Sequence, residues 1–386
     1  FRSKKAKLFL VVAIFSTLLT GPMPTFAQDN DSVATLRQIG RTFAAIADKA
    51  SPAVVVLKVD GSVPKERSEI KGPLRFSPDG RRIICFDQPR VDPPSVRAGR
   101  PGIRRRSTGL GFIVSADGHI LTNHSVVDQA SRITAELTDG RQLKAKVIGA
   151  DPATDVAVVK IDADDLPALE LGDSDPLQVG DWVVGIGNSM GMGRTFSAGL
   201  VTAKGRSSLG MTAIEDFIQT SLNMHLGDGG GPLLDLDGKV VGINTAIIGR
   251  EQGLGISLAI PVNMVKSAYE QIIKTGKVER GFLGVAFQDV TPKIAEAHGL
   301  ESTKGAIVTE VIPDSAAYEA GIKKYDVIEQ CNGASVEPGT RLLHLVALLK
   351  PGQEVELVVV REGKRQTLTV TLGKRPSPKT NAPEED

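Results

Sequence analysis

From Leu226 to Leu234 the chain reads Leu-Gly-Asp-Gly-Gly-Gly-Pro-Leu-Leu. A turn this rich in glycine can direct successive backbone N–H groups at one point, the arrangement that stabilises an oxyanion. We therefore expect an oxyanion-hole turn made by Gly227, Asp228 and Gly229. The third of these residues has no side chain, so the turn offers no group that could attack a carbonyl carbon.

Two blocks upstream accompany this turn. They read Leu-Thr-Asn-His-Ser-Val-Val from Leu121 to Val127 and Asp-Pro-Ala-Thr-Asp-Val-Ala from Asp151 to Ala157. With the turn, they resemble the HtrA/Deg (Do-like) family of trypsin-fold serine proteases with a C-terminal PDZ domain. The resemblance covers about residues 50–374. It implies a mainly β fold, a chymotrypsin-like double β-barrel followed by a small α/β PDZ domain.

Only one of the three catalytic-triad residues of the family has the same residue type at the matching position of this sequence. The family has Gly-Asn-Ser-Gly-Gly-Pro at the turn and Leu-Thr-Asn-Asn-His-Val-Val in the first block. Gly229 therefore stands at the nucleophile position and Ser125 at the base position, while Asp155 matches the carboxylate that orients the base. The only nearby imidazole, His124, is one residue early. One step along a helical turn rotates a side chain by about 100°, so we expect His124 to point away from the nucleophile position.

These substitutions predict a catalytically degenerate member of the family. Removing the nucleophile or the base alone lowers turnover by about 10⁶-fold. A residual of about 10³ to 10⁴ over water comes from the oxyanion hole and binding. Asp228 adds a carboxylate beside the hole, which opposes developing negative charge. We therefore expect an HtrA-like pseudoprotease that binds unfolded segments or protein C-termini, as a chaperone, adaptor or regulatory partner in protein quality control.

Two alternatives remain open. The first is a serine-type endopeptidase of the HtrA/Deg family with a rearranged active site, built on His225 with Asp228 or on His124 with Ser125. The second is a PDZ scaffold, in which the barrels serve as an oligomerisation platform. The three hypotheses differ in whether a hydroxyl lies beside an imidazole and in which domain binds the partner.

The C-terminal region resembles a PDZ domain of the permuted bacterial type. Gly-Phe-Leu-Gly-Val, starting at Gly281, matches the loop that binds a peptide's terminal carboxylate. In this mode the peptide adds a strand to a sheet edge. Tyr325 stands where the family usually has glycine, which we expect to alter the turn before Asp326. The residues expected to bind the peptide are Phe282, Leu283, Gly284 and Val285.

The N-terminal segment has the features of a secretory signal peptide. A basic region extends to Lys7, an apolar run of thirteen residues follows from Leu8 to Thr20, and Thr25-Phe26-Ala27 resembles a cleavage site. The apolar run is shorter than the roughly 20 residues of a membrane span, so an uncleaved anchor is the weaker alternative. The expected location is outside the inner membrane, in the periplasm or another extracytoplasmic compartment.

The expected domain organisation follows from these blocks. Short strands separated by Asp-Gly turns are typical of β-barrels, and the single tryptophan, Trp182, is expected in the core of the second barrel. Within the long loop, residues 81–86 could form a strand. A Pro-rich, charged end is typical of disorder. The expected segments are a signal peptide at 1–27, the double barrel at 28–277 with a long loop at 61–107, the PDZ domain at 278–374 and a disordered tail at 375–386.

Composition limits the possible partners. The 46 Lys and Arg against 45 Asp and Glu give a net charge of +1, so no nucleic acid partner is expected. Only two cysteines, Cys85 and Cys331, are present, too few for a disulfide framework. The five histidines are scattered, so no metal and no cofactor is expected. The resemblance implies unfolded proteins or C-terminal peptides as partners, an active HtrA-type paralogue, and a trimer-based homo-oligomer.

Overall fold

The structure is a computed structural model that describes residues 30–62, 83–85, 104–188, 193–207, 209–225, 227–248, 256–337 and 339–374. The chain divides into two compact units, Phe1–Ala45 and Ile46–Asp386. The expected signal peptide, residues 1–27, and the expected tail, residues 375–386, lie outside the described residues. None of the described helices is long and apolar enough to cross a membrane.

The described chain begins with helix α2 (Asn30–Ala50). Its apolar residues recur every three or four positions, the spacing of an amphipathic helix. Two residues of that apolar face, Leu36 and Ile39, are exposed. A short 3-10 helix (Ser51–Ala53) follows, with Pro52 in its first turn, where no backbone N–H is required.

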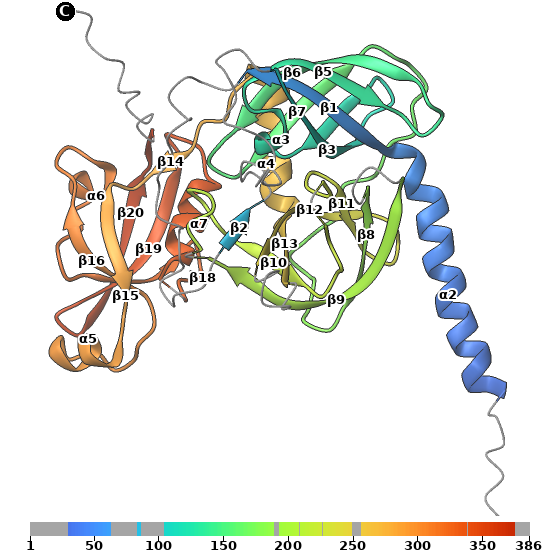
Figure 1. Ribbon diagram of the computed structural model, residues 1–386. Coiled ribbons are helices and arrows are strands. Elements are labelled where there is room, and N and C mark those ends of the chain that lie inside the picture. The colour runs from blue at the N-terminus through green and yellow to red at the C-terminus, as the bar shows by residue number, and fades with distance from the viewer. Residues whose placement is uncertain are drawn as a thin grey trace, which may run out of the picture. The chain divides into compact units, whose positions relative to one another are not determined.

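A closed six-stranded barrel comes next (Figure 1). Neighbouring strands are antiparallel, and alternate side chains fill the interior, including Leu57, Leu110 and Phe112, which are fully buried. The short helix α3 (His124–Val127) follows its third strand. In their order around the barrel the strands are β1 (Val54–Ser62), β3 (Arg104–Ile113), β4 (His119–Thr122), β7 (Val156–Ile161), β6 (Gln142–Asp151) and β5 (Ala130–Glu136).

The second barrel also closes, because β11 pairs with both β8 and β12. Strand β2 (Ile83–Cys85) adds to its edge by pairing with β12, so the expected loop 61–107 contains a strand. Both ends of that loop are also strand: residues 61–62 belong to β1 and residues 104–107 to β3, so the predicted loop was too long. Helix α4 (Val262–Thr275) follows the barrel. The barrel strands are β8 (Trp182–Gly187), β9 (Thr195–Arg206), β10 (Phe217–Thr220), β11 (Pro232–Leu234), β12 (Val240–Ile248) and β13 (Ile256–Pro261).

The prediction that Trp182 is a core residue was wrong. Trp182 is the first residue of β8, opposite Leu200 of β9, and 44% of its surface is exposed. Strand alternation gives the reason, because Val183, the next residue, is fully buried in the barrel.

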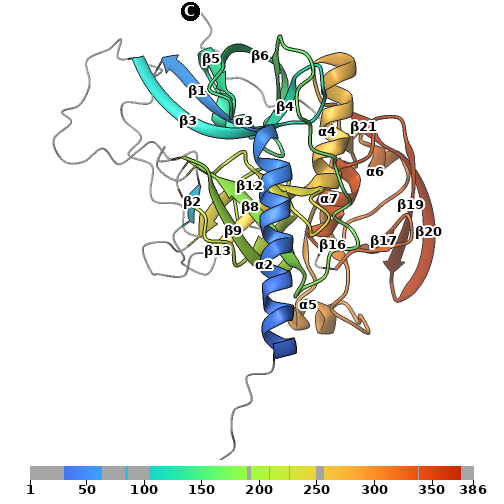
Figure 2. The same cartoon turned by 90° about the vertical axis from the view of Figure 1, so that its right-hand side faces the viewer.

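The PDZ domain contains one six-stranded sheet and one two-stranded sheet. In Figure 2, β16, β17, β19 and β20 run beside one another. Strand β15 is the terminal strand of the larger sheet, paired only with β16 among the described strands. The elements are β14 (Gly281–Phe282), β15 (Val285–Asp289), α5 (Pro292–Ala297), β16 (Ala306–Val311), α6 (Ala316–Glu319), β17 (Val327–Cys331), β18 (Ala334–Ser335), α7 (Arg341–Ala347), β19 (Glu354–Arg361), β20 (Lys364–Thr371) and β21 (Gly373–Lys374).

Tyr325 occupies a turn that favours glycine. Its φ is +74°, in the left-handed region where a Cβ costs about 1–2 kcal/mol. Its ring lies 4.9 Å from that of His298, and the ammonium of Lys324 lies 5.0 Å from the tyrosine ring centroid. The backbone turn is therefore kept without glycine, with ring contacts offsetting part of the cost.

Replacing this residue separates the backbone cost from the ring contacts. Tyr325→Gly and Tyr325→Ala both remove the ring, but only glycine relieves the positive φ. We expect the glycine variant to be more stable than the alanine variant by about 1 kcal/mol in urea denaturation of the full chain. Equal stability of the two variants would contradict this interpretation.

Candidate functional site

The glycine turn is tied to both barrels. The carbonyl of Gly229 accepts a hydrogen bond from the N–H of Leu110 in β3 at 2.9 Å, and the N–H of Gly230 donates to Asn244 in β12 at 2.9 Å. Gly230 has a φ of +86°, and a Cβ there would lie 2.1 Å from the carbonyl oxygen of Leu110. Glycine at position 230 is therefore what lets the turn approach the first barrel.

Gly229, which the resemblance matches to the nucleophile position, does not have the positive φ that favours glycine. Gly227 and Gly230 have positive φ, whereas Gly229 is not among the described glycines in that region. The missing hydroxyl therefore does not follow from a backbone constraint on Gly229.

Asp155 receives three hydrogen bonds from two different barrels. The N–H of Ser125 donates to Oδ1 at 2.7 Å, and the Ser125 hydroxyl donates to Oδ2 at 3.1 Å. The hydroxyl of Thr245, in the second barrel, donates to the same Oδ2 at 2.9 Å. The structure thus brings together Asp155 and Ser125, the two residues that the resemblance matches to the carboxylate and base positions of a triad.

Burial dominates the acidity of Asp155. The side chain is enclosed between the barrels, and this burial raises the pKa of Asp155 to about 6. The hydrogen bonds from Ser125 and Thr245 favour the ionised form and oppose the shift without cancelling it. The carboxyl therefore changes charge near neutral pH.

His124 lies beside this site, and among the described residues no hydrogen bond joins its ring to Asp155. Its backbone N–H donates to the carbonyl of Asp155 at 3.1 Å, and its Nε2 lies 3.9 Å from Oδ1 of Asp128 on the same helical turn. Among the described residues, no hydroxyl lies within hydrogen-bond distance of the His124 imidazole. A pair of His124 with Ser125 is therefore not formed in this structure, where Ser125 bonds to Asp155 instead.

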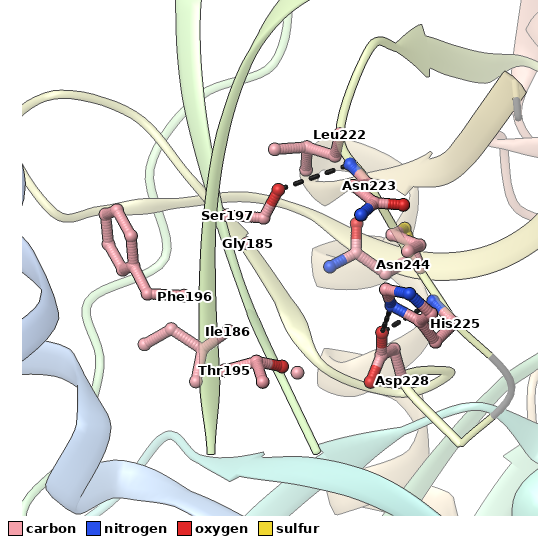
Figure 3. Close-up of a pocket in the computed structure, with 12 residues that line it drawn as sticks. Gly185, Ile186, Thr195, Phe196, Ser197, Leu222, Asn223, His225, Asp228 and Asn244 are labelled. Atoms are coloured by element: carbon pink, nitrogen blue, oxygen red, sulfur yellow. Dashed lines mark hydrogen bonds and ion pairs between the residues drawn. The ribbon is translucent and has the colours of Figure 1, made fainter. Parts of the chain in front are cut away.

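The other hypothetical pair, His225 with Asp228, does lie together. The N–H of His225 donates to Oδ2 of Asp228 at 2.7 Å, and its Nδ1 lies 3.7 Å from the same oxygen (Figure 3). The Asp228 carboxylate also accepts the N–H of Asn188 at 2.8 Å and is 4% exposed. This pair supplies an acid and a base but no attacking hydroxyl.

The hydroxyls next to that pair bond to the backbone. Ser221 Oγ accepts from the N–H of Leu200 at 2.9 Å, and the hydroxyl of Ser257 donates to the carbonyl of Leu222 at 2.7 Å. Thr220 is buried, and its Oγ1 accepts from the N–H of Leu222 at 3.4 Å. These contacts give each hydroxyl a structural role.

One serine and one histidine that the sequence analysis did not consider do meet. Ser115 Oγ lies 3.0 Å from Nδ1 of His119, and Oδ1 of Asp117 lies 3.0 Å from the same nitrogen. In a triad the carboxylate and the hydroxyl use opposite ring nitrogens, so this cluster cannot relay a proton from Ser115 to Asp117 through the ring. The Ser115 hydroxyl lowers the pKa of Asp117, as expected for a tight turn.

The expected carboxylate-binding loop lies at the free edge of the PDZ sheet. Leu283 and Gly284 fall between β14 and β15, outside both strand pairings. Gly284 has a φ of +86°, and its carbonyl accepts from the N–H of Ile312 at 2.9 Å. Leu283 is buried in the domain core, whereas Phe282 and Val285 are half-buried. The loop backbone, more than the Leu283 side chain, is therefore placed to contact a ligand.

Arg280 was missed by the sequence analysis. Its side chain is 4% exposed at the start of the PDZ domain, where it donates to Asp151 of β6 and to the carbonyl of Ala347. Asp151 in turn accepts a hydrogen bond from Thr154. Arg280 also donates to the hydroxyl of Thr154 at 3.3 Å. A single arginine in a linker gives no sequence signal of this kind, although Asp151 and Thr154 both belong to the Asp151–Ala157 block.

No group of His, Cys, Asp and Glu suited to a metal ion occurs among the described residues. Burial raises the pKa of the Cys331 thiol to about 11, so it stays protonated. Cys85 belongs to β2.

Two family models match this chain, one in the double-barrel domain and one in the C-terminal domain. Residues 109–243 match the trypsin-like peptidase domain, and residues 281–372 match the PDZ domain. A probable periplasmic serine endoprotease, DegP-like, of Chlamydia muridarum (strain MoPn / Nigg) is 41% identical over 356 residues, covering 89% of this chain and 70% of that protein. A protein with the same description from Marinomonas sp. (strain MWYL1) is 41% identical over 342 residues, with coverages of 87% and 72%.

Solved structures of HtrA-type proteases are also similar to this chain. The HtrA-type protease AlgW with a decapeptide is 37% identical, with a TM-score of 0.65, covering 87% of this chain and 99% of that one. AlgW with a tripeptide is 35% identical, with a TM-score of 0.67 and coverages of 88% and 99%. The expected fold, a double β-barrel followed by a PDZ domain, is confirmed.

The raised pKa of Asp155 makes a prediction about stability. The folded protein binds the proton of the Asp155 carboxyl more tightly than the unfolded chain does, because an aspartate in an unfolded chain has a pKa of about 3.9. Stability from this group is therefore absent above about pH 7 and grows as the pH falls. We expect lowering the pH from 7 to 5 to add about 1 kcal/mol to the free energy of unfolding, and Asp155→Asn to remove that increment.

Urea denaturation at the two pH values measures this increment. Asp128→Asn, which changes an exposed carboxylate near the same site, is the matched control and should keep the wild-type pH dependence. The interpretation fails if Asp155→Asn and the wild type respond equally to pH.

Proposed function

Because the chain belongs to the HtrA/DegP-like family of trypsin-fold serine endoproteases with a PDZ domain, we propose that it is a pseudoprotease of that family. It binds unfolded segments or protein C-termini without cutting them. The observation that carries the proposal is the pair of Gly229 and Ser125 at the nucleophile and base positions, with the Ser125 hydroxyl bonded to Asp155. Among the described residues, neither Ser125 nor any other hydroxyl at this site is hydrogen-bonded to an imidazole that could take its proton.

The size of the expected loss in turnover favours binding over catalysis. Loss of the nucleophile or the base each lowers turnover by about 10⁶-fold, and loss of both lowers it little further. The backbone hydrogen bonds that join the turn to Leu110 and Asn244 do not need a nucleophile, and they support the proposal that the cleft still holds a polypeptide.

The PDZ domain supplies the second binding site of the proposal. Relatives of this fold were solved with a decapeptide and with a tripeptide bound. In this chain the N–H groups at positions 283–285 are proposed to hold the terminal carboxylate, while the peptide extends along the edge of β15. The proposed compartment is the periplasm, in line with the names of the relatives and with the expected signal peptide at 1–27.

We also propose a trimer-based homo-oligomer, with an active HtrA-type paralogue as a further partner. The exposed Leu36 and Ile39 of α2 and the exposed Trp182 of β8 are apolar surfaces that assembly would cover. A rearranged endopeptidase remains the second candidate, since the family is one of proteases. In a pure PDZ scaffold, by contrast, the barrels would bind no polypeptide.

Labelling with a fluorophosphonate tests the absence of a nucleophile. We expect no covalent adduct in the intact mass of the protein and no digestion of casein above the blank. An adduct that disappears when one hydroxyl residue is replaced would establish the rearranged endopeptidase instead.

Restoring the triad tests where the base position lies. Gly229→Ser alone should stay inactive, because no imidazole faces the new hydroxyl. Gly229→Ser with Ser125→His should produce measurable casein hydrolysis that uses Asp155, and adding Asp155→Asn should lower that turnover by about 10⁴-fold. Activity of the single Gly229→Ser variant would mean that His124 or His225 reaches the site.

The carboxylate requirement of the PDZ site can be measured on the full chain. A C-terminal peptide with a free carboxylate should bind about 10-fold more tightly than the same peptide with an amidated end, because only the carboxylate accepts charge-assisted hydrogen bonds from the loop. Fluorescence anisotropy gives both affinities. Equal affinities would contradict the assignment of the loop at 282–285.

A further inference from the structure

Helix α7 of the PDZ domain contacts the second barrel through two side chains. The Nε2 atom of His344 lies 3.2 Å from Oδ2 of Asp216, which directly precedes β10. One turn earlier in the helix, Oγ1 of Thr340 lies 2.9 Å from Oγ of Ser207, which directly follows β9. Both domains belong to the compact unit Ile46–Asp386. The helix therefore joins the PDZ domain to the segment between β9 and β10.

The imidazole of His344 is enclosed in this contact. Its side chain is 13% exposed, and its Nδ1 atom has no hydrogen-bond partner among the described residues. A neutral imidazole carries one N–H, which His344 can place on Nε2 and donate to Asp216. An imidazolium carries a second N–H on Nδ1, and this buried donor would have no acceptor. The geometry of the contact therefore suits the neutral ring and not the charged ring.

The charges that face His344 from the elements around it do not reverse this preference. Burial lowers the pKa of His344 and is the largest effect. Arg341, on the same helix, and Arg280, in the linker before the PDZ domain, lower the pKa further by charge repulsion. Asp216 and Asp175, on the barrel side, raise it without cancelling the shift. The imidazolium is thus less favourable in the contact than in water.

We propose that His344 is an acid-sensitive contact, whose protonation releases α7 from the segment between β9 and β10. In the released form the ring is exposed to water, where both of its N–H groups find acceptors. The released form therefore binds the proton more tightly than the docked form does, and acid shifts the equilibrium toward release. This release does not depend on whether the barrels cleave a polypeptide or only bind it.

Asp216 has the opposite pH dependence, in a more acidic range. Burial is the main cause of a raised pKa of Asp216, to which the charge of Asp175 adds. The charges of His344, Arg341 and Lys204 lower this pKa without cancelling the shift. Protonation of Asp216 therefore favours the docked form at low pH. An exposed imidazole has a pKa of about 6.5 and an exposed aspartate one of about 3.9, so we expect the release between about pH 7 and pH 5.

The other end of the helix is held by a group that the release leaves in place. Arg280 donates to Asp151 of β6 and, at 2.8 Å, to the carbonyl of Ala347 in the last turn of α7. Neither contact involves His344. The linker thus stays attached to the first barrel while the segment of α7 around Thr340 and His344 leaves the second.

Hydrogen exchange of the full chain measures this release. Mass spectrometry follows peptides from α7 and from residues 209–216, with rates corrected for the intrinsic pH dependence of amide exchange. We expect the corrected rates of both segments to rise by up to about 10-fold from pH 7.5 to pH 5.5. This is the change in the equilibrium constant for release that protonation of an imidazole with a pKa of about 6.5 produces over that interval. Strand β17, in the PDZ core, is the internal reference and should not change.

Two glutamine variants identify the histidine that is responsible. His344→Gln has no group to protonate at this position, but its amide can still donate a hydrogen bond to Asp216, so exchange of α7 should lose its pH dependence. His298→Gln replaces an exposed histidine of the same domain and should keep the wild-type pH dependence. A cooperative unfolding transition shows that each variant is folded before its exchange is compared.

Asp216→Asn separates burial of the imidazole from its pairing with the carboxylate. The asparagine oxygen can still accept the N–H of a neutral His344, whereas the buried imidazolium loses its counter-charge. The acid-induced rise in exchange should therefore persist in this variant. Loss of the rise would mean that Asp216 is the titrating group, and the proposal would be wrong.

The wild type and the histidine variant supply the other decisive outcomes. Equal corrected rates at the two pH values overturn the proposal, as does a His344→Gln variant that keeps the pH dependence. Slower exchange at pH 5.5 also overturns it, because an ion pair of His344 with Asp216 would then hold the helix in acid. Protonation of Asp155 stabilises the barrels as the pH falls, so it cannot produce the faster exchange.

Discussion

The hydrogen bonds to Asp155 are the interaction on which the architecture of the cleft depends. Ser125 donates to this carboxylate from the first barrel and Thr245 donates from the second, so one buried group joins the two halves of the protease-like domain. Burial keeps its pKa near 6, which makes the group costly to ionise. Asp155, which the resemblance matches to the carboxylate that orients the base, therefore links the two barrels in this structure.

The glycine turn is likewise held by contacts that do not involve a side chain at position 229. Leu110 and Asn244 hold it from both sides, and Gly230 permits the close approach. These contacts involve backbone atoms, so they do not require a serine at position 229. The shape of the turn therefore depends on backbone contacts and not on the side chain at position 229.

Much of the fold could be predicted from the sequence, but its boundaries and surface positions could not. Asp-Gly turns indicated β-barrels, and the family resemblance of the motif blocks implied two barrels and a PDZ domain. The loop expected at 61–107 was too long, because strand β3 starts at Arg104 and pairs with β1. Trp182 was expected in the core and is 44% exposed, since hydrophobicity alone does not tell which side of a strand faces inward.

The sequence by itself determined that Gly229 carries no hydroxyl and that Ser125 carries no imidazole, because a missing side chain is a property of the residue and needs no coordinates. Only the tertiary structure decided which groups meet. It brought Ser125 onto Asp155, Arg280 onto Asp151, and His344 onto Asp216. These partners are separated by between 30 and 129 positions in the chain, and only the folding of strands against one another brings such distant residues into contact.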